Sequence, residues 1–140
     1  MNIYPAIDLI GGEVVRLHKG DFAQQTTYGS DPIAVAQSYA DQGAEWLHLV
    51  DLDGAKNPEN RQLSLISDII ANTGLKVQTG GGIRAIADVE KLAAAGASRI
   101  VIGSLAVKDH AALAEIFATF GGDAICLAAD VIPVGSSFNI

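Results

Sequence analysis

Residues 76–104 read KVQTGGGIRAIADVEKLAAAGASRIVIGS, a stretch that alternates apolar runs of strand length with a helical pattern. The runs Lys76–Gly80 and Arg99–Ser104 lack strict polar alternation, which is typical of strands buried on both faces. The intervening segment Ala85–Ala95 has helical periodicity and precedes Gly96, a residue type that commonly ends helices. A strand, a helix and a strand in this order predict a parallel pair with a right-handed crossover.

The same alternation continues on both sides of this stretch. Three further strands are expected at Ile3–Asp8, Trp46–Leu52 and Ala124–Asp130. Further helices are expected from Asp31-Pro32 to Gly43, over about Arg61–Asn72 with Gly74 beyond, and from Asp109 to Gly121-Gly122. The order βαβαβαβαβ predicts an α/β fold with a parallel sheet. The long segment Gly11–Gly29 is expected to hold a short hairpin and to act as a binding loop or lid, with a surface decoration as the alternative.

Length, composition and charge restrict the class of protein. The 140 residues are 49% hydrophobic and 18% charged, which fits one compact domain and excludes disordered and disulfide-rich chains. Nine Lys and Arg against 16 Asp and Glu give a net charge of -7 without a basic patch, so neither nucleic acid nor a membrane surface is an expected partner. The single cysteine, Cys126, cannot form an internal disulfide, and no apolar run reaches the ~18 residues of a membrane span. We therefore expect a cytoplasmic protein without a signal peptide.

Polar residues or glycines stand where each of the five expected strands ends. They are Asp8, Asp51, Gly80-Gly81-Gly82, Gly103-Ser104 and Asp130. Ligands bind at the C-terminal edge of the strands in open parallel sheets and in barrels alike. Carboxylates at a buried edge cost free energy unless they are paired or solvated, so this pattern indicates a functional edge.

Two glycine loops favour a phosphate site. Glycine lets the backbone approach an anion closely, and the N-terminus of the following helix offers free N–H groups. The loop Gly80–Gly82 with Ile83-Arg84 and the loop Gly103-Ser104 follow neighbouring strands, so both are expected to meet at one phosphate. Ordinary turn glycines are the alternative.

Asp8 and Asp130 favour acid–base chemistry. As the ends of the first and fifth strands they would face the mouth of a barrel from nearly opposite sides. There one carboxylate can accept a proton while the other, with a raised pKa, donates one. A metal pair or a structural cap is the alternative, but no His or Cys stands at ligand spacing, so no metal ion is expected.

Three more residues are candidates for substrate contacts. Arg16 lies in the expected hairpin, where it is either a clamp for phosphate or carboxylate or a solvated charge. His48 lies within an apolar strand, where a core histidine is the alternative. Strand parity puts His48 and Asp51 on opposite sides, and Asp51 is expected either to orient a loop or to contact substrate.

These motifs together resemble a known family. The segments Ile3–Leu9 with Gly12–Leu17, Leu47–Leu52 with Gly54-Ala55-Lys56, Gly80–Arg84, and Ile102–Ser104 with Ala106-Val107 are similar to the ProFAR isomerases of histidine biosynthesis. The resemblance covers residues 1 to about 131. The cyclase subunit of imidazole glycerol phosphate synthase is the alternative, and it differs from this chain around Leu47–Lys56.

The resemblance implies a (β/α)₈ barrel that converts a bis-phosphorylated aminoaldose into an aminoketose by an Amadori rearrangement, without a cofactor. By the same resemblance Asp8 is the general base that removes the C2′ proton, and Asp130 is the general acid that helps to open the ribose ring. The resemblance further assigns the phosphate site of the N-terminal half to Gly81, Gly82, Gly103 and Ser104, and substrate contacts to Arg16 and His48.

The chain is too short for a whole barrel, which needs roughly 200 to 250 residues. We expect a half-barrel of about four and a half βα units at residues 1–131 and a divergent tail at 132–140, where Pro133 suits a central strand poorly. A truncated gene, a shifted reading frame and a cut fragment would each explain the tail. Two functions follow: an isomerase that is weak or inactive as the isolated chain, or a non-catalytic half-barrel that binds phosphate or self-associates through its open edge.

Overall fold

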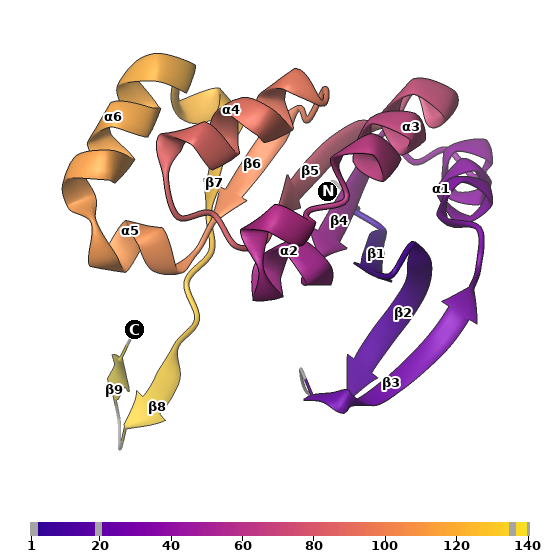
Figure 1. Cartoon of the computed structure of the whole chain (residues 1–140), viewed down its shortest axis with the longest axis horizontal. Helices are drawn as coiled ribbons and strands as arrows, with labels where there is room; N and C mark the ends of the chain where they lie inside the picture. Colours follow the sequence, from indigo (N-terminus) through magenta and orange to yellow (C-terminus); the bar gives the residue numbers. More distant parts are fainter. Residues whose placement is uncertain (1–2, 19–20, 135–136, 140) are drawn as a thin grey trace.

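A sheet of seven strands, in the order β3-β2-β1-β4-β5-β6-β7, forms the centre of the molecule (Figure 1). The computed structural model describes residues 3–18, 21–134 and 137–139. The strands are β1 (Ala6–Ile10), β2 (Glu13–His18), β3 (Asp21–Gly29), β4 (Trp46–Asp51), β5 (Lys76–Gly80), β6 (Arg99–Ile102) and β7 (Ile125–Leu127). Strands β1, β4, β5, β6 and β7 run parallel, and β2 and β3 add an antiparallel hairpin. The predicted α/β fold with a parallel sheet is confirmed.

Helices follow the parallel strands along the chain. They are α1 (Pro32–Asp41), α2 (Leu52–Lys56), α3 (Leu63–Thr73), α4 (Ile86–Ala94), α5 (Ser104–Lys108) and α6 (His110–Phe120), with 3-10 turns η1 (Pro58–Asn60) and η2 (Gly122–Ala124). The four longer helices are those that the sequence predicts, and the carboxylates of Asp31 and Asp109 cap α1 and α6 by accepting from Ala34 and Ala112. None of the described helices is long and apolar enough to cross a membrane.

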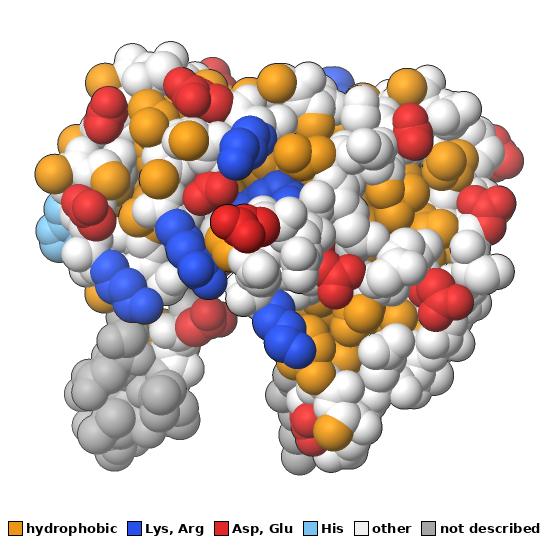
Figure 2. Space-filling view, viewed as in Figure 1, with side chains coloured by type: hydrophobic (Ala, Val, Ile, Leu, Met, Phe, Trp, Pro, Cys, Tyr) orange, Lys and Arg blue, Asp and Glu red, His pale blue; other side chains and the backbone are white. Residues whose placement is uncertain are grey.

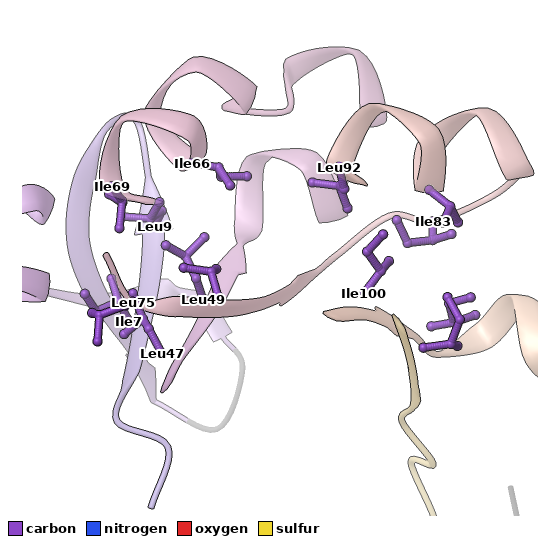
Figure 3. Packing of buried hydrophobic residues seen from close by; sticks show 14 of the residues in the cluster. Ile7, Leu9, Leu47, Leu49, Ile66, Ile69, Leu75, Ile83, Leu92 and Ile100 are labelled. Carbon is purple, nitrogen blue, oxygen red and sulfur yellow. The ribbon is translucent and has the colours of Figure 1, made fainter. Parts of the chain in front are cut away.

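Helices cover one face of the sheet. The buried side chains of β1, β4 and β6 pack there against α3, α4 and α6, and Figure 3 shows the part of this packing that involves α3 and α4. The largest fully buried side chains include Ile7, Leu9, Leu47, Leu49, Ile66, Ile69, Leu92, Ile100 and Ile116. Along β4, buried residues alternate with partly exposed ones. The expectation of strands buried on both faces was therefore wrong for the described part of this chain, because its second face stays open.

The structure moves the ends of two expected strands. β1 continues past Asp8 to Ile10, because Gly11 and Gly12 have positive φ angles of 58° and 82° and form a two-residue hairpin turn into β2. Asp8 therefore lies in the middle of β1, and its expected place at a strand end was wrong. The fifth expected strand is shorter, since β7 ends at Leu127 and leaves Asp130 in the coil beyond.

The tail forms a separate ribbon. Strands β8 (Ile132–Val134) and β9 (Ser137–Asn139) pair with each other in antiparallel fashion and extend away from the main sheet (Figure 1). Pro133 thus lies in a two-stranded ribbon, where a missing N–H donor disturbs no central ladder.

Candidate functional site

The open face of the sheet carries Asp8 and His48 on adjacent parallel strands. Asp8 pairs with Val50 of β4 and His48 pairs with Ala6 of β1, so the two side chains are diagonal neighbours. Burial raises the pKa of Asp8, against the charges of His48 and Arg16, which lower it. Burial lowers the pKa of His48, against the charge of Asp8, which raises it. A carboxylate whose pKa is raised is a stronger proton acceptor, so this pair suits a general base beside a neutral imidazole.

Arg16 stands beside this pair on β2. It is the neighbour of Val15, which pairs with Asp8, and its charge reaches the Asp8 carboxylate. Its side chain is exposed and lines a hollow of about 290 Å³ on the hairpin together with Leu17, His18, Thr26 and Tyr28. The structure therefore brings Arg16, Asp8 and His48 together, as the sequence predicts for residues of one site.

Gln78 and Arg99 extend the polar row of the open face, and neither was expected from the sequence. The Nε2 atom of Gln78 lies 3.1 Å from Nδ1 of His48, and the guanidinium of Arg99 donates to Oε1 of Gln78 over 3.4 Å. Arg99 also lies over the ring of Trp46, 4.8 Å from its centroid. Strand parity was the signal that could have found Gln78, because it alternates with the buried Val77 and Thr79.

Asp51 was expected either to orient a loop or to contact substrate, and in the structure it orients loops. The side chain is fully buried on the helix-covered side of β4. Its carboxylate accepts hydrogen bonds from the backbone N–H of Gly54 (3.0 Å), the backbone N–H of Gln62 (2.8 Å) and the Gln62 side-chain amide (3.1 Å). Gln62 in turn accepts from the N–H of Gly12, so Asp51 organises loops under the candidate site instead of facing the open surface.

Arg61 holds the glycine loop after β5, a role that the sequence did not indicate. Its guanidinium donates to the carbonyl oxygens of Gly81 (2.6 Å) and Gly82 (3.2 Å) and lies 3.6 Å from the carboxylate of Asp88. The Arg61 side chain is only 2% exposed. A buried cation therefore fixes the shape of the loop that was predicted to bind phosphate.

Close packing explains why Gly81 and Gly82 are glycines. Both have positive φ angles, 108° and 66°. A Cβ atom on Gly81 would lie 2.7 Å from the carbonyl oxygen of Asp51, and one on Gly82 would overlap the carbonyl oxygen of Gly54. These residues let the loop sit directly on α2, which supports the turn-glycine alternative, while phosphate binding by this loop stays a prediction.

The start of α4 differs from the expectation of free N–H groups. The N–H groups of Arg84 and Ala85 donate to the carboxylate of Asp88, at 2.9 and 3.2 Å. The expectation that this helix start offers those donors to an anion was wrong, because the acidic side chain occupies them. The side chain of Arg84 is exposed and remains available to a ligand.

The structure brings Asp130 to the second glycine loop. A cavity of about 290 Å³ is lined by Gly103, Ser104, Val107, Lys108, Ala128 and Asp130. Figure 2 shows Lys and Arg side chains over the region of α2, α4 and α5, with Asp and Glu side chains among them. Within the described ranges, no group of three or more His, Cys, Asp or Glu is placed to hold a metal ion.

Asp8 and Asp130 lie on well-separated parts of the sheet. Asp8 is on β1 and Asp130 follows β7, and β4, β5 and β6 lie between these strands. The two carboxylates therefore belong to the first of the five parallel strands of the sheet and to the segment that follows the last.

Comparison with known proteins identifies the group to which the chain is related. Residues 2–137 match the model of the family described as "Histidine biosynthesis protein". The chain belongs to this family. Members of the histidine biosynthesis family are TIM barrels, and the described sheet of this chain corresponds to about half of one.

Three relatives in the histidine biosynthesis family carry the same name, 1-(5-phosphoribosyl)-5-((5-phosphoribosylamino)methylideneamino)imidazole-4-carboxamide isomerase, or ProFAR isomerase. The protein of Shewanella loihica is 54% identical over 92% of this chain and 53% of its own length. The protein of Maricaulis maris is 51% identical over 99% of this chain and 57% of its own length. The protein of Mannheimia succiniciproducens is 57% identical over 92% of this chain and 52% of its own length. The chain thus spans about half the length of the curated relatives it matches.

Proposed function

We propose that this chain carries the N-terminal half of the active site of an aldose–ketose isomerase, which rearranges the bis-phosphorylated ribotide ProFAR. The observation that carries the proposal is the half-buried Asp8 on the open face, with its pKa raised by burial and with His48 and Arg16 beside it. The shared isomerase name of the three relatives favours this reaction over the cyclase.

In the proposed reaction, Asp130 gives its proton to the ribose ring oxygen, and the ring opens to leave a C1′=N double bond. Asp8 takes the proton from C2′, and the C–H electron pair forms a C1′=C2′ double bond while the C1′=N electrons return to nitrogen. Asp8 then returns its proton to C1′, and the C2′ hydroxyl gives its proton to the Asp130 carboxylate, which yields the ketone. All hydrogen transfers are internal to the substrate and the two carboxyls, so the balance closes without an oxidant or reductant, and we propose no cofactor.

One phosphate of the substrate would bind in the cavity after β6. Ser104 offers a hydroxyl, Gly103 a close backbone approach and Lys108 a positive charge, and Asp130 lines the same space. Gly81, Gly82 and the exposed side chain of Arg84 would contribute from the neighbouring loop. A local arrangement of this kind can bind an anion on a chain of net charge -7.

A chimera tests the proposal directly. Residues 1–131 are fused to the C-terminal half of the Shewanella loihica relative, and ProFAR turnover is measured. We expect the chimera to turn over ProFAR, and we expect turnover to fall by at least about 10²-fold in Asp8→Asn and in Asp130→Asn. The exposed control Asp41→Asn should retain turnover. A folded chimera without turnover, or one indifferent to Asp8→Asn, would contradict the proposed function.

The 140-residue chain on its own should turn over ProFAR far more slowly than the chimera. Binding energy from the part of the substrate beyond this half would be lost, and such remote binding supports turnover as well as affinity. Equal rates for the chain and the chimera would show that this half suffices.

A second function, self-association, is favoured by the edge strand β7. No strand of the described residues pairs with its outer edge, and Leu127 there is 51% exposed. An unpaired edge with an exposed apolar side chain favours pairing with another chain, so we propose that two copies associate through this edge.

We also infer a cytoplasmic location. The lone Cys126 has no second cysteine in the chain with which to pair, which suits a reducing compartment.

A further inference from the structure

Gln78 is the middle member of a three-residue row across the open face. The register of the sheet pairs His48 of β4 with Gln78 of β5, and Gln78 with Arg99 of β6. The side chains follow this register: Gln78 Nε2 lies 3.1 Å from His48 Nδ1, and Arg99 donates to Gln78 Oε1 over 3.4 Å. A contact at one end of the row can therefore fix the orientation at the other.

The chemistry of Arg99 determines which atoms donate and which accept hydrogen bonds along this row. A guanidinium has only donors, so the Gln78 atom that faces Arg99 must be its oxygen. The Gln78 NH₂ group then faces His48, and Nδ1 of His48 must be an acceptor without a hydrogen. Arg99 itself is held by the ring of Trp46 and by the hydroxyl of Tyr4 at 3.5 Å, which opposes its rotation.

The charges around His48 come from four strands. Asp8 faces it from β1, Arg16 acts on the same carboxylate from β2, and Lys76 and Arg99 both lie against the ring of Trp46, two residues before His48. Burial lowers the pKa of His48, which agrees with an imidazole whose Nδ1 accepts a hydrogen bond. A neutral His48 also leaves the Asp8 carboxylate a stronger base than an imidazolium neighbour would.

We propose that Gln78, with its amide oriented by Arg99, is a positioning residue that holds His48 as the neutral tautomer with its hydrogen on Nε2. This hydrogen is the donor that His48 offers to a substrate oxygen beside Asp8, a use that rests on the proposed function. The tautomer itself is a property of the chain without substrate.

The test is nitrogen-15 NMR of the 140-residue chain labelled at histidine, with His18→Gln and His110→Gln used to assign the His48 signals. In the unmodified chain, Nε2 should be protonated and Nδ1 should not. Gln78→Glu replaces the donor with an acceptor, so the hydrogen should move to Nδ1 and the pKa of His48 should rise by about one unit or more. Gln78→Met should raise the pKa of His48 by less, because it only removes the bond that stabilises the neutral form. The control Gln25→Glu adds the same charge at an exposed position of β3 and should change neither property.

A protonated Nδ1 in the unmodified chain would overturn the proposal, as would a Gln78→Glu chain that behaves like Gln25→Glu. If Gln78→Glu fails to fold, the unmodified chain and Gln78→Met still decide between the outcomes. The same substitutions in the chimera separate the two proposals. If the chimera shows no turnover but the tautomer and pKa of His48 still change in the Gln78 variants, the result would contradict the proposed isomerase function and support the positioning role of Gln78. A lowered kcat with a shifted pH profile in Gln78→Met would support both.

Discussion

The guanidinium of Arg61 donates a 2.6 Å hydrogen bond to the carbonyl oxygen of Gly81, twenty residues further along the chain. The same guanidinium lies 3.6 Å from the carboxylate of Asp88. The approach to α3, the loop after β5 and the first turn of α4 are therefore joined by one buried cation. The conformation of the candidate phosphate loop therefore depends on Arg61, a buried residue that does not lie on the open face.

Replacing Arg61 with Met should destabilise the chain strongly. The substitution leaves the buried carboxylate of Asp88 without its ion pair and two carbonyl oxygens without a donor. We expect the free energy of unfolding to fall by about 3 kcal/mol, measured by urea denaturation. Arg84→Met is the matched control, because the Arg84 side chain is exposed, and it should change stability by less than about 0.5 kcal/mol. Equal losses in the two variants would contradict the role of Arg61.

Gly82→Ala should be more damaging than an equivalent change at Gly12. Both glycines have positive φ, but a Cβ atom on Gly82 would overlap the carbonyl oxygen of Gly54, whereas one on Gly12 would meet nothing within 4 Å. We expect about 1 kcal/mol of lost stability for Gly12→Ala and clearly more for Gly82→Ala. Thermal unfolding of the two variants measures the difference, and similar transition temperatures would show that the loop can move off α2.

Asp8→Asn should alter the pH dependence of stability. Burial raises the pKa of Asp8 in the folded chain, so between the unfolded pKa near 3.8 and the folded pKa the folded state binds more protons. The free energy of unfolding of the parent chain therefore contains a contribution that falls as the pH rises through this window. The Asn variant lacks that contribution, so its stability relative to the parent should increase from acid to neutral pH in urea titrations.

Asp21→Asn is the control of opposite sign. Hydrogen bonds from Ala23 and Gln24 lower the pKa of Asp21, so its stabilising contribution is present at neutral pH and is lost as the pH falls through the folded pKa. At neutral pH the Asn variant should therefore be less stable than the parent chain, and this difference in the free energy of unfolding should disappear in acid. The same pH trend in both variants would contradict the assignment for Asp8.

Leu127→Lys should weaken self-association. A charged side chain on the unpaired edge of β7 disfavours the approach of a second strand. Sedimentation or size-exclusion measurements over a range of concentrations should show association of the parent chain and less of it for the variant. Val107→Lys places the same charge at an exposed position of α5, outside the sheet, and as the control it should leave association unchanged. A parent chain that stays monomeric throughout would argue against an adhesive edge.

Local signals made most of the fold predictable from the sequence. The bounds of β5 agree with the predicted run Lys76–Gly80, because a glycine run marks its end. The carboxylates of Asp31 and Asp109 located the starts of two helices, since a cap acts on residues only three positions away. The short helices α2 and α5 were missed, because five residues are too few to show a helical period.

Features that depend on distant partners could not be predicted in this way. The continuation of β1 beyond Asp8 depends on its register with β2. The role of Arg61 depends on Gly81, and that of Gln78 on His48, thirty residues away. The strand-end carboxylate Asp51 looked like a ligand contact as much as a loop anchor, and only its burial separates the two. The residue types of the site were thus predictable, but the contacts that orient them were not.

The buried carboxylate of Asp51 also has a consequence for how this part of the molecule opens. Its bonds to Gly54 and Gln62, and the further bond from Gly12 to Gln62, join the hairpin turn after β1, the start of α2 and the start of α3. Opening one of these segments removes hydrogen bonds that support the others. Their amide protons should therefore exchange with solvent at a common rate, as one cooperative unit whose exchange is slower than that of the edge strand β3.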